Sequence, residues 1–441
     1  MDCEILRTLY VKSNGEVPCH DDAGECVLLG VVEAEEPSWT IQRLLDNDRY
    51  AHIRSSFARG RVPWDGICQR CAFLRPGLPL QDHVGRRRLN KLQVEPTLNC
   101  DLRCPCCTSG RQRRVRPKPH VMPLGAYEGT LRSLRAERFK LKTIEYCGQG
   151  EPLSHPEFHE LAALGRRYFP RARQRLITNG NFDYQAATRG LELDEIYVSC
   201  DGVRQRSYEQ YRRKGSVERA LKFMRDAAAL GTRQAVVWKY LLFEFNDSDD
   251  ELHEAQRVAE RLGVDMLLFA VTASKYRSQR YTQETLATLP IVSPIVHVEH
   301  CPTCHEGARF GRRLETHFAA EAVSSWLPAW LHRRRCWAQL HELAALPEGV
   351  LTLRGWAAAT KPLTHVEAYC DGRRIGSARL TSLRGDVFAR HRHFLRQPAG
   401  FYLSVQLKRP FRSRSQISIV VLDGGRRRGQ LVETFELAPV P

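Results

Sequence analysis

The stretch Val94–Cys107, VEPTLNCDLRCPCC, contains three cysteines in the spacing C-x3-C-x2-C, namely Cys100, Cys104 and Cys107. They directly follow a run of β-forming residues, so a strand is expected to bring three thiolates onto one tight loop. A cubane iron–sulfur cluster takes four soft thiolate ligands, and three would leave one iron open to a substrate. Cys106 lies in the same stretch, however, and four close sulfurs also suit a structural zinc ion. The stretch therefore predicts a metal centre and leaves its metal open.

From about residue 89 to residue 269, short β-rich runs alternate with longer helical patterns, which predicts repeated βα units and a parallel sheet. The expected strands are Leu92–Pro96, Thr143–Cys147, Arg175–Thr178, Glu195–Ser199, Ala235–Leu242 and Met266–Phe269. The expected helices are Leu124–Glu137, Pro156–Phe169, Val217–Leu230 and Ser248–Leu262, the last with a serine N-cap and Glu251 three residues on. Six such units predict an α/β fold in the form of an open, partial (βα)6 barrel.

Short motifs rich in glycine and polar residues follow three of these strands. GQGEP follows the second strand, TNGN ends the third and SCDG ends the fourth; they span Gly148–Pro152, Thr178–Asn181 and Ser199–Gly202. Ligand sites of open α/β sheets and barrels are built from the loops at the carboxyl ends of the strands. The motifs and the cysteine loop are therefore expected to meet at one end of the sheet.

In order and spacing, these four motifs resemble those of the radical S-adenosylmethionine (SAM) superfamily. The resemblance implies that Cys100, Cys104 and Cys107 hold a 4Fe-4S cluster whose open iron chelates SAM. It also implies a SAM site formed by Cys106, Gly148, Gln149, Gly150, Glu151, Pro152, Asn179, Ser199 and Asp201. Two departures stand out. Gln149 is either inserted between the glycines of the family's Gly-Gly-Glu-Pro motif or replaces one of them, and Cys106 stands where relatives usually have an aromatic residue.

The first 82 residues contain a second group of cysteines, Cys3, Cys19, Cys68 and Cys71, with Cys26 as an alternative to Cys3. This pattern resembles the auxiliary-cluster modules called SPASM or twitch, although in the family such a module usually follows the barrel. The resemblance implies an auxiliary 4Fe-4S cluster. Because four thiolates complete the coordination of a cluster, this one would serve electron transfer. A structural zinc ion suits the same four cysteines and remains an alternative.

Changes in pattern along the chain predict four domains. We expect the auxiliary-cluster module at 1–82, the radical SAM barrel at 86–275, a helical or irregular region at 276–345 and a small β-sandwich at 346–441. The last prediction rests on alternating segments separated by Gly, Pro and Asp turns. Within the third region, Cys301 and Cys304 in HCPTCHE are candidates for a further metal site.

The composition is that of a folded globular protein, with 441 residues, of which 42% are hydrophobic and 27% are charged. No export signal or membrane-spanning run is seen, so we expect a cytoplasmic protein without a membrane partner. In that compartment thiols stay reduced, and the 15 cysteines point to metal ligation rather than to disulfides. The net charge of +17 suits an anionic partner. It also follows from an arginine-rich composition without selection for binding, so we do not predict a nucleic-acid partner.

Taken together, these features predict a radical SAM enzyme of uncertain subclass that cleaves SAM reductively and modifies a peptide or protein by hydrogen abstraction. A small-molecule substrate, either a sugar or a nucleotide-linked compound, and RNA are alternatives. A zinc-stabilised scaffold without enzymatic activity is the alternative of another class. An enzyme would need a reducing electron donor such as flavodoxin or ferredoxin. No side chain can be named from the sequence as a catalytic acid or base.

Overall fold

The computed structural model describes residues 2–20, 26–33, 39–68, 71, 74–75, 80–107, 109–229, 234–272, 274–282, 285–293, 295–299, 309–320, 336–345, 350–380, 382–383, 398–407 and 414–437. The chain divides into two compact units. One comprises residues 1–75 and 80–282, and the other comprises residues 76–79 and 283–441.

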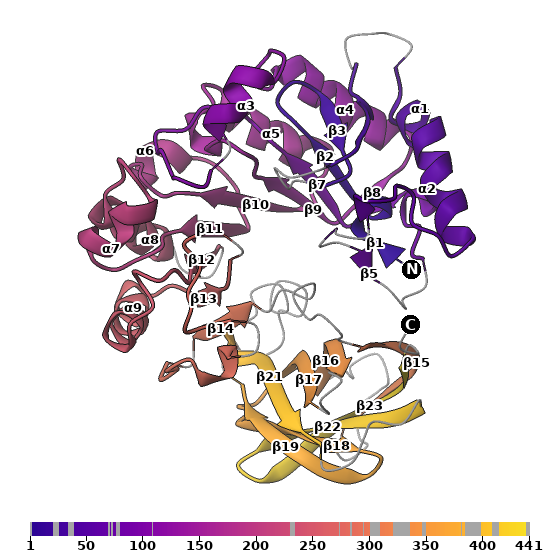
Figure 1. The fold of residues 1–441 in the computed structure, drawn as a ribbon, viewed down its shortest axis with the longest axis vertical. Helices are drawn as coiled ribbons and strands as arrows, with labels where there is room; N and C mark the ends of the chain where they lie inside the picture. Colours follow the sequence, from indigo (N-terminus) through magenta and orange to yellow (C-terminus); the bar gives the residue numbers. More distant parts are fainter. Residues whose placement is uncertain are drawn as a thin grey trace. The chain divides into compact units, whose positions relative to one another are not determined.

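The first unit is built on seven parallel strands in the order β13-β12-β11-β10-β9-β7-β2 (Figure 1). Their bounds are β2 Thr8–Val11, β7 Lys91–Val94, β9 Thr143–Tyr146, β10 Arg173–Thr178, β11 Glu195–Ser199, β12 Ala235–Leu241 and β13 Met266–Ala270. All six strands predicted from the sequence are present, with ends that differ by two residues at most. The seventh strand, β2, was not predicted.

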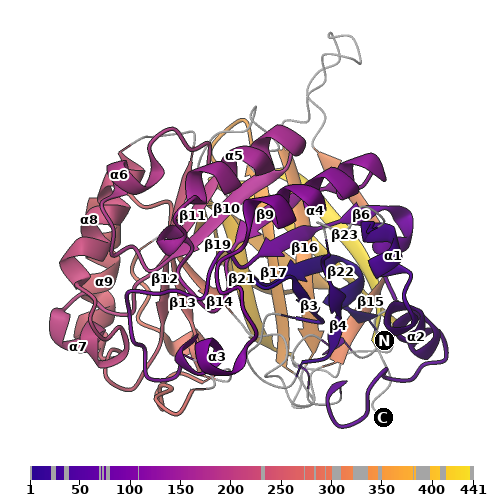
Figure 2. The same cartoon turned by 90° about the horizontal axis from the view of Figure 1, so that it is seen from above.

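The helices lie along the outer side of this curved row of strands (Figure 1). Helices α8 and α9 lie at one end of the row, and α1 and α2 lie at the other (Figure 2). The bounds are α1 Ile41–Leu45, α2 Asp48–Ala58, α3 Ser109–Val115, α4 Leu124–Ala136, α5 Phe158–Tyr168, α6 Tyr184–Thr188, α7 Gln205–Tyr211, α8 Val217–Ala228 and α9 Asp249–Leu262. Helices α4, α5, α8 and α9 are the four predicted ones. As expected, the Ser248 hydroxyl caps α9 by accepting a hydrogen bond from the Glu251 N–H.

Side chains alternate between the two faces of the sheet. On β11, Ile196 and Val198 are fully buried. Val198 lies close to Gly180, as does Phe223 of α8. Residues at the intervening positions, such as Ser199, point to the inner face, away from the helices. The α/β fold with a large parallel sheet is therefore confirmed.

The N-terminal residues do not form a separate unit. Strand β2 pairs in parallel with β7, from Thr8 opposite Lys91 to Val11 opposite Val94. The remaining short elements of the first unit are β1 Asp2–Cys3, β3 Glu16–Pro18, β4 Leu28–Val31, β5 Leu74–Arg75, β6 Arg88–Leu89, β8 Lys140–Leu141, and the 3-10 turns Glu4–Leu6, Val84–Arg86 and Pro152–Ser154. The predicted boundary at residue 82 differs from this arrangement, because β2 near the start of the chain pairs with β7 in the parallel sheet.

The second unit contains an antiparallel sheet of nine strands in the order β19-β18-β22-β23-β15-β16-β17-β21-β20. The elements of this unit are β14 Val296–Glu299, β15 Arg309–Ala320, β16 Cys336–Ala345, β17 Val350–Ala359, β18 His365–Cys370, β19 Arg373–Arg379, β20 Ser382–Leu383, β21 Pro398–Gln406, β22 Arg414–Asp423, β23 Arg426–Leu437 and a 3-10 turn, Leu286–Thr288. Buried side chains such as Val366, Phe401 and Ile419 form its core.

Antiparallel strands are present within 346–441, and the region at 276–345, which was expected to be helical or irregular, also contains strands. Strands β15 and β16 lie in the middle of the sheet order, so their residues belong to the β unit. The described strands of this unit follow one hydrogen-bonded order. The RFGRRLETHFAA segment of β15 carries a weak strand signal, because charged residues interrupt its alternation. Within the described part of the chain, no helix is long and apolar enough to cross a membrane.

Candidate active site

The three predicted cluster ligands lie together on the loop between β7 and α3. Cys100 and Cys104 are half-buried and Cys107 is exposed, and none of the three forms a disulfide. The Cys107 N–H donates to the Cys104 carbonyl over 3.1 Å, which closes a tight turn between these two cysteines. Burial raises the pKa of Cys100 to about 12 and also raises the pKa of Cys104. A metal centre that binds here must therefore displace thiol protons.

The donor set fits an iron–sulfur cluster with an open site, because one short loop presents three thiols and the metal would have a soft ligand set. Among the described residues, no group of three or more His, Cys, Asp or Glu side chains is already arranged as a metal site.

The GQGEP motif packs directly against the base of the cysteine loop. A Cβ atom on Gly150 would lie 2.7 Å from the carbonyl carbon of Leu98, and one on Gly148 would lie 2.6 Å from the Cβ of Glu95. Real Cβ atoms do not approach that closely, so both positions require glycine. The Gln149 carbonyl oxygen lies 3.9 Å from Cys107 Sγ. The glycines thus allow the backbone of the motif to reach the cysteine loop.

Glu151 is a buried carboxyl group at the centre of the motifs. Its oxygens accept hydrogen bonds from Thr178 Oγ1 over 2.7 Å, from the Asn179 N–H over 2.8 Å and from the Leu153 N–H over 3.2 Å. Burial is the largest cause that raises its pKa, to about 7. The ionised form is costly in this position, and a cation placed beside it would be favoured.

Asn179 joins the TNGN motif to the cysteine loop. Its side-chain amide donates to Asp101 Oδ1 over 2.7 Å and lies 4.0 Å from Cys100 Sγ. The site residues that were predicted from the second and third strand ends are therefore gathered around the three cysteines.

Asp201, which the resemblance assigns to the SAM site, is engaged within the protein through its carboxylate. It is fully buried, and its two oxygens accept hydrogen bonds from Arg212 Nε over 2.6 Å and from the Leu241 N–H over 2.8 Å. The charge of Arg212 also acts on the thiol of Cys104, where it lowers the pKa against the larger raising effect of burial. Asp201 thus holds the guanidinium group of Arg212 near Cys104, which is a predicted cluster ligand. Ser199, at the end of β11, is half-buried on the inner face, opposite Lys239 of β12.

Sequence reasoning missed Arg212, which is one of two adjacent arginines in YRRKGS and carries no signal of its own. It also missed an aromatic group near Cys106. Tyr211 precedes Arg212 and packs against Phe243, with the rings tilted by 34° and their centroids 4.4 Å apart. Burial is the largest cause that raises the pKa of Tyr211, and the charges of Cys104 and Cys106 contribute. An aromatic ring is therefore present beside the loop, although Cys106 itself offers none.

A ladder of charged side chains crosses the inner face of the sheet. Lys91 pairs with Glu145 over 2.8 Å, Glu145 with Arg175 over 2.9 Å, Arg175 with Glu195 over 2.6 Å and Glu195 with Arg173 over 2.7 Å. The cations are the more exposed members, at 30% for Lys91, 22% for Arg175 and 16% for Arg173, against 6% for Glu145 and 7% for Glu195. The ladder therefore presents mainly positive groups.

The N-terminal cysteines are also brought together. Pairing of β1 with β5 places Cys3 opposite Leu74, three residues after Cys71. Cys3, Cys26 and Cys71 are all close enough to Cys19 for their charges to help raise its pKa to about 12, although burial is the largest cause. Cys68 is next to Cys71, whose N–H donates to the Cys68 carbonyl. The structure thus makes Cys26 a close neighbour, although the prediction held it only as an alternative. Cys301 and Cys304 lie outside the described residues.

Residues 94–258, which contain the cysteine loop and all three strand-end motifs, match the family model of the radical SAM superfamily. This part of the chain is a radical SAM domain. The superfamily uses a 4Fe-4S cluster and SAM, so the predicted domain, its two cofactors and the enzyme class are confirmed at the level of this domain. The SPASM or twitch assignment stays a prediction.

The chain is also similar to known proteins over part of its length. The GTP 3',8-cyclase of Peptoclostridium acidaminophilum is 26% identical over 187 residues, which is 42% of this chain and 56% of that protein. The chain thus matches about half the length of this curated relative. Among solved structures, Streptococcus suis SuiB bound to S-adenosylmethionine has a TM-score of 0.37 and 16% identity over 45% of each chain. A radical SAM methyltransferase from Sphaerobacter thermophilus has the same TM-score and identity over 47% of this chain and 65% of its own.

Proposed function

We propose that this protein is a radical SAM enzyme that reductively cleaves SAM at a 4Fe-4S cluster held by Cys100, Cys104 and Cys107 and then abstracts a hydrogen atom from its substrate. One observation carries the proposal. The GQGEP and TNGN motifs, which follow different strands, both contact the cysteine loop through Gly150, Glu151 and Asn179.

When bound, the cluster and SAM supply the electron and the radical for hydrogen abstraction. The protein contributes binding, orientation and the exclusion of water. Glu151 is suited to hold the ammonium group of the methionine moiety of SAM, because a neighbouring cation offsets the cost of ionising this buried carboxyl. Arg212 lies beside Cys104, where a fixed positive charge favours a thiolate ligand.

The proposed substrate is a peptide or protein with anionic groups. The charged ladder on the inner face supports an anionic substrate, because its cations are more exposed than its carboxylates. A nucleotide-linked or other small anionic molecule fits the same surface and is the second candidate. The RNA alternative rests on the net charge of +17 and on the basic run from Arg111 to Arg116. Two of its arginines are used inside the protein, since Arg113 donates to the Leu98 carbonyl and Arg116 pairs with Glu95.

We further propose that the N-terminal cysteines hold an auxiliary 4Fe-4S cluster for electron transfer. The proposed ligands are Cys3, Cys19, Cys68 and Cys71, with Cys26 as an alternative to Cys3; the charges of Cys3, Cys26 and Cys71 all act on Cys19. A flavodoxin or ferredoxin would supply the reducing electrons, and both clusters suit a compartment such as the cytoplasm in which thiols remain reduced.

Iron, sulfide and zinc should be measured after anaerobic reconstitution of the full chain. Two cubane clusters predict about eight iron atoms per chain. A Cys19→Ser/Cys71→Ser variant should retain about half of this iron. Zinc in place of iron in the N-terminal group would contradict the auxiliary cluster, and wild-type protein that binds zinc alone would favour the scaffold alternative.

A further inference from the structure

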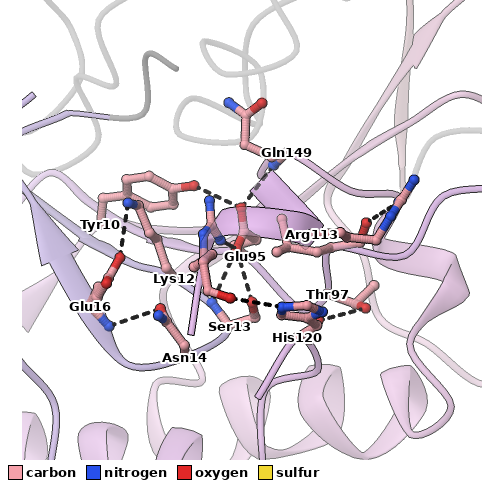
Figure 3. Close-up of polar contacts among 12 residues, drawn as sticks. Tyr10, Lys12, Ser13, Asn14, Glu16, Glu95, Thr97, Arg113, His120 and Gln149 are labelled. Carbon is pink, nitrogen blue, oxygen red and sulfur yellow. Dashed lines mark hydrogen bonds and ion pairs between the residues drawn. The ribbon is translucent and has the colours of Figure 1, made fainter. Parts of the chain in front are cut away.

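Glu95 is a fully buried carboxylate directly below the GQGEP motif, and it receives five hydrogen bonds. Its Oε1 accepts from Arg116, from the Ser13 N–H over 3.2 Å and from the Ser13 hydroxyl over 3.0 Å. Its Oε2 accepts from the Gln149 N–H over 2.9 Å and from the Tyr10 hydroxyl over 3.2 Å. Figure 3 shows Tyr10 and Ser13 pointing toward Glu95, whereas the Gln149 side chain points away from it.

The hydrogen bond from the Gln149 N–H to Glu95 fixes the position of the Gln149 backbone, which reaches the cysteine loop. Gln149 donates its N–H to Glu95, and its carbonyl oxygen lies 3.9 Å from Cys107 Sγ. Gly148 packs against the side chain of Glu95 so closely that no Cβ fits between them. Glu95 therefore determines how far this peptide approaches the cysteine loop.

The other donors come from two further segments of the chain. Tyr10 and Ser13 belong to β2 and the turn after it, and this turn leads through β3 to Cys19 in the N-terminal cysteine group. Arg116 follows α3 and the cysteine loop, whose Leu98 carbonyl also accepts from Arg113 over 2.7 Å. One carboxylate thus joins the N-terminal segment, the segment after the cysteine loop and the GQGEP motif.

We propose that Glu95 is a positioning residue that holds the Gln149 peptide in its SAM-binding place and fixes the N-terminal cysteine segment to the same point. The proposal rests on the proposed function, since it assigns Glu95 to the SAM site. A hydrogen bond to a charged group is stronger than one between neutral groups, and a buried carboxylate that is fully paired has one preferred arrangement. Neither Glu95 nor Arg116 is among the three cysteines or the GQGEP, TNGN and SCDG motifs through which this sequence resembles the family.

The test variant is Glu95→Gln in the full chain. The side-chain amide has one acceptor and one donor end. Its oxygen is needed on the side of Arg116 and Ser13, so its NH2 group faces the Gln149 N–H, which loses its acceptor. The matched control is Glu145→Gln on the neighbouring strand, which makes the same substitution at another buried, ion-paired carboxylate of the inner-face ladder.

Two quantities should be measured. Hydrogen–deuterium exchange of the peptide containing Gln149, before cluster reconstitution, should become about tenfold faster in Glu95→Gln and not in the control. After reconstitution, the Kd for SAM should rise about tenfold in Glu95→Gln, and the change that SAM causes in the electron paramagnetic resonance spectrum of the reduced cluster should weaken.

Wild-type exchange rates and an unchanged Kd for SAM in Glu95→Gln would overturn the proposal, as would faster exchange without any change in that Kd. If Glu95→Gln does not fold, Ser13→Ala removes one donor and keeps the charge pair, and it should show the same two changes at about threefold. Wild-type protein that binds no cluster would refute the proposed function instead, and the exchange measurement would still decide whether Glu95 holds the Gln149 peptide.

Discussion

The buried carboxyl of Glu151 is predicted to make the cluster-free protein less stable as the pH rises, and Glu151→Gln should remove this dependence. Its pKa rises from 4.5 to about 7 in the folded protein, mainly because the group is fully buried. At 1.36 kcal/mol per pKa unit, this shift corresponds to about 3 kcal/mol. Because the folded protein binds this proton more tightly than the unfolded chain, the stabilisation is complete below pH 4.5 and is lost as the pH rises through 7.

The Glu151→Gln variant stays neutral and should lack this dependence. The free energy of unfolding should be measured by urea denaturation of the cluster-free wild type and variant at several pH values from 4.5 to 8. The wild type should lose about 3 kcal/mol relative to the variant across that range. Curves that stay parallel for the two proteins would refute the burial and charge state assigned to Glu151.

Three further substitutions test other parts of the site. Gly150→Ala should abolish SAM binding to the reconstituted protein, because its Cβ would lie 2.7 Å from Leu98 C. Gly125→Ala in α4, where nothing lies within 4 Å, should bind SAM like the wild type and is the control. Arg212→Met leaves Asp201 buried without its cation and should lower the free energy of unfolding by about 3–5 kcal/mol in urea denaturation; a loss below about 1 kcal/mol would contradict the buried pair. Cys106→Ser should keep the wild-type iron content after reconstitution, whereas a loss of metal would favour a site with four sulfurs.

Most of the parallel sheet could be predicted because its signals are local. Strands β7 and β9 to β13 are short β-rich runs, and helices such as α9 begin at a recognisable cap, Ser248. Strand β2 could not be predicted in the same way. Its four residues, TLYV, become part of the sheet only through pairing with β7, which lies about 80 residues further along the chain. Likewise, β15 joins the sheet of the second unit through its pairing with β23, far along the chain.

The residues of the candidate site also fall into those identified by local sequence signals and those identified only by the folded structure. Cys100, Gly150, Glu151 and Asn179 stand in contiguous motifs, and the sequence therefore identifies them. Arg212 contributes through Asp201, which precedes it by 11 residues, and through Cys104, which is distant in sequence, so only the folded chain shows its place. Glu95 was visible in the first stretch of sequence, but its five donors come from four separate positions.

The measurement that tests the central claim most directly is the formation of 5′-deoxyadenosine from SAM by the reconstituted, chemically reduced protein, with wild type compared with Cys104→Ala. The wild type is predicted to form 5′-deoxyadenosine and methionine in equal amounts, and Cys104→Ala is predicted to form neither. Cleavage of SAM by Cys104→Ala at the rate of the wild type, or no cleavage by an iron-loaded wild type, would contradict the assignment of Cys100, Cys104 and Cys107 as the ligands of a SAM-cleaving cluster.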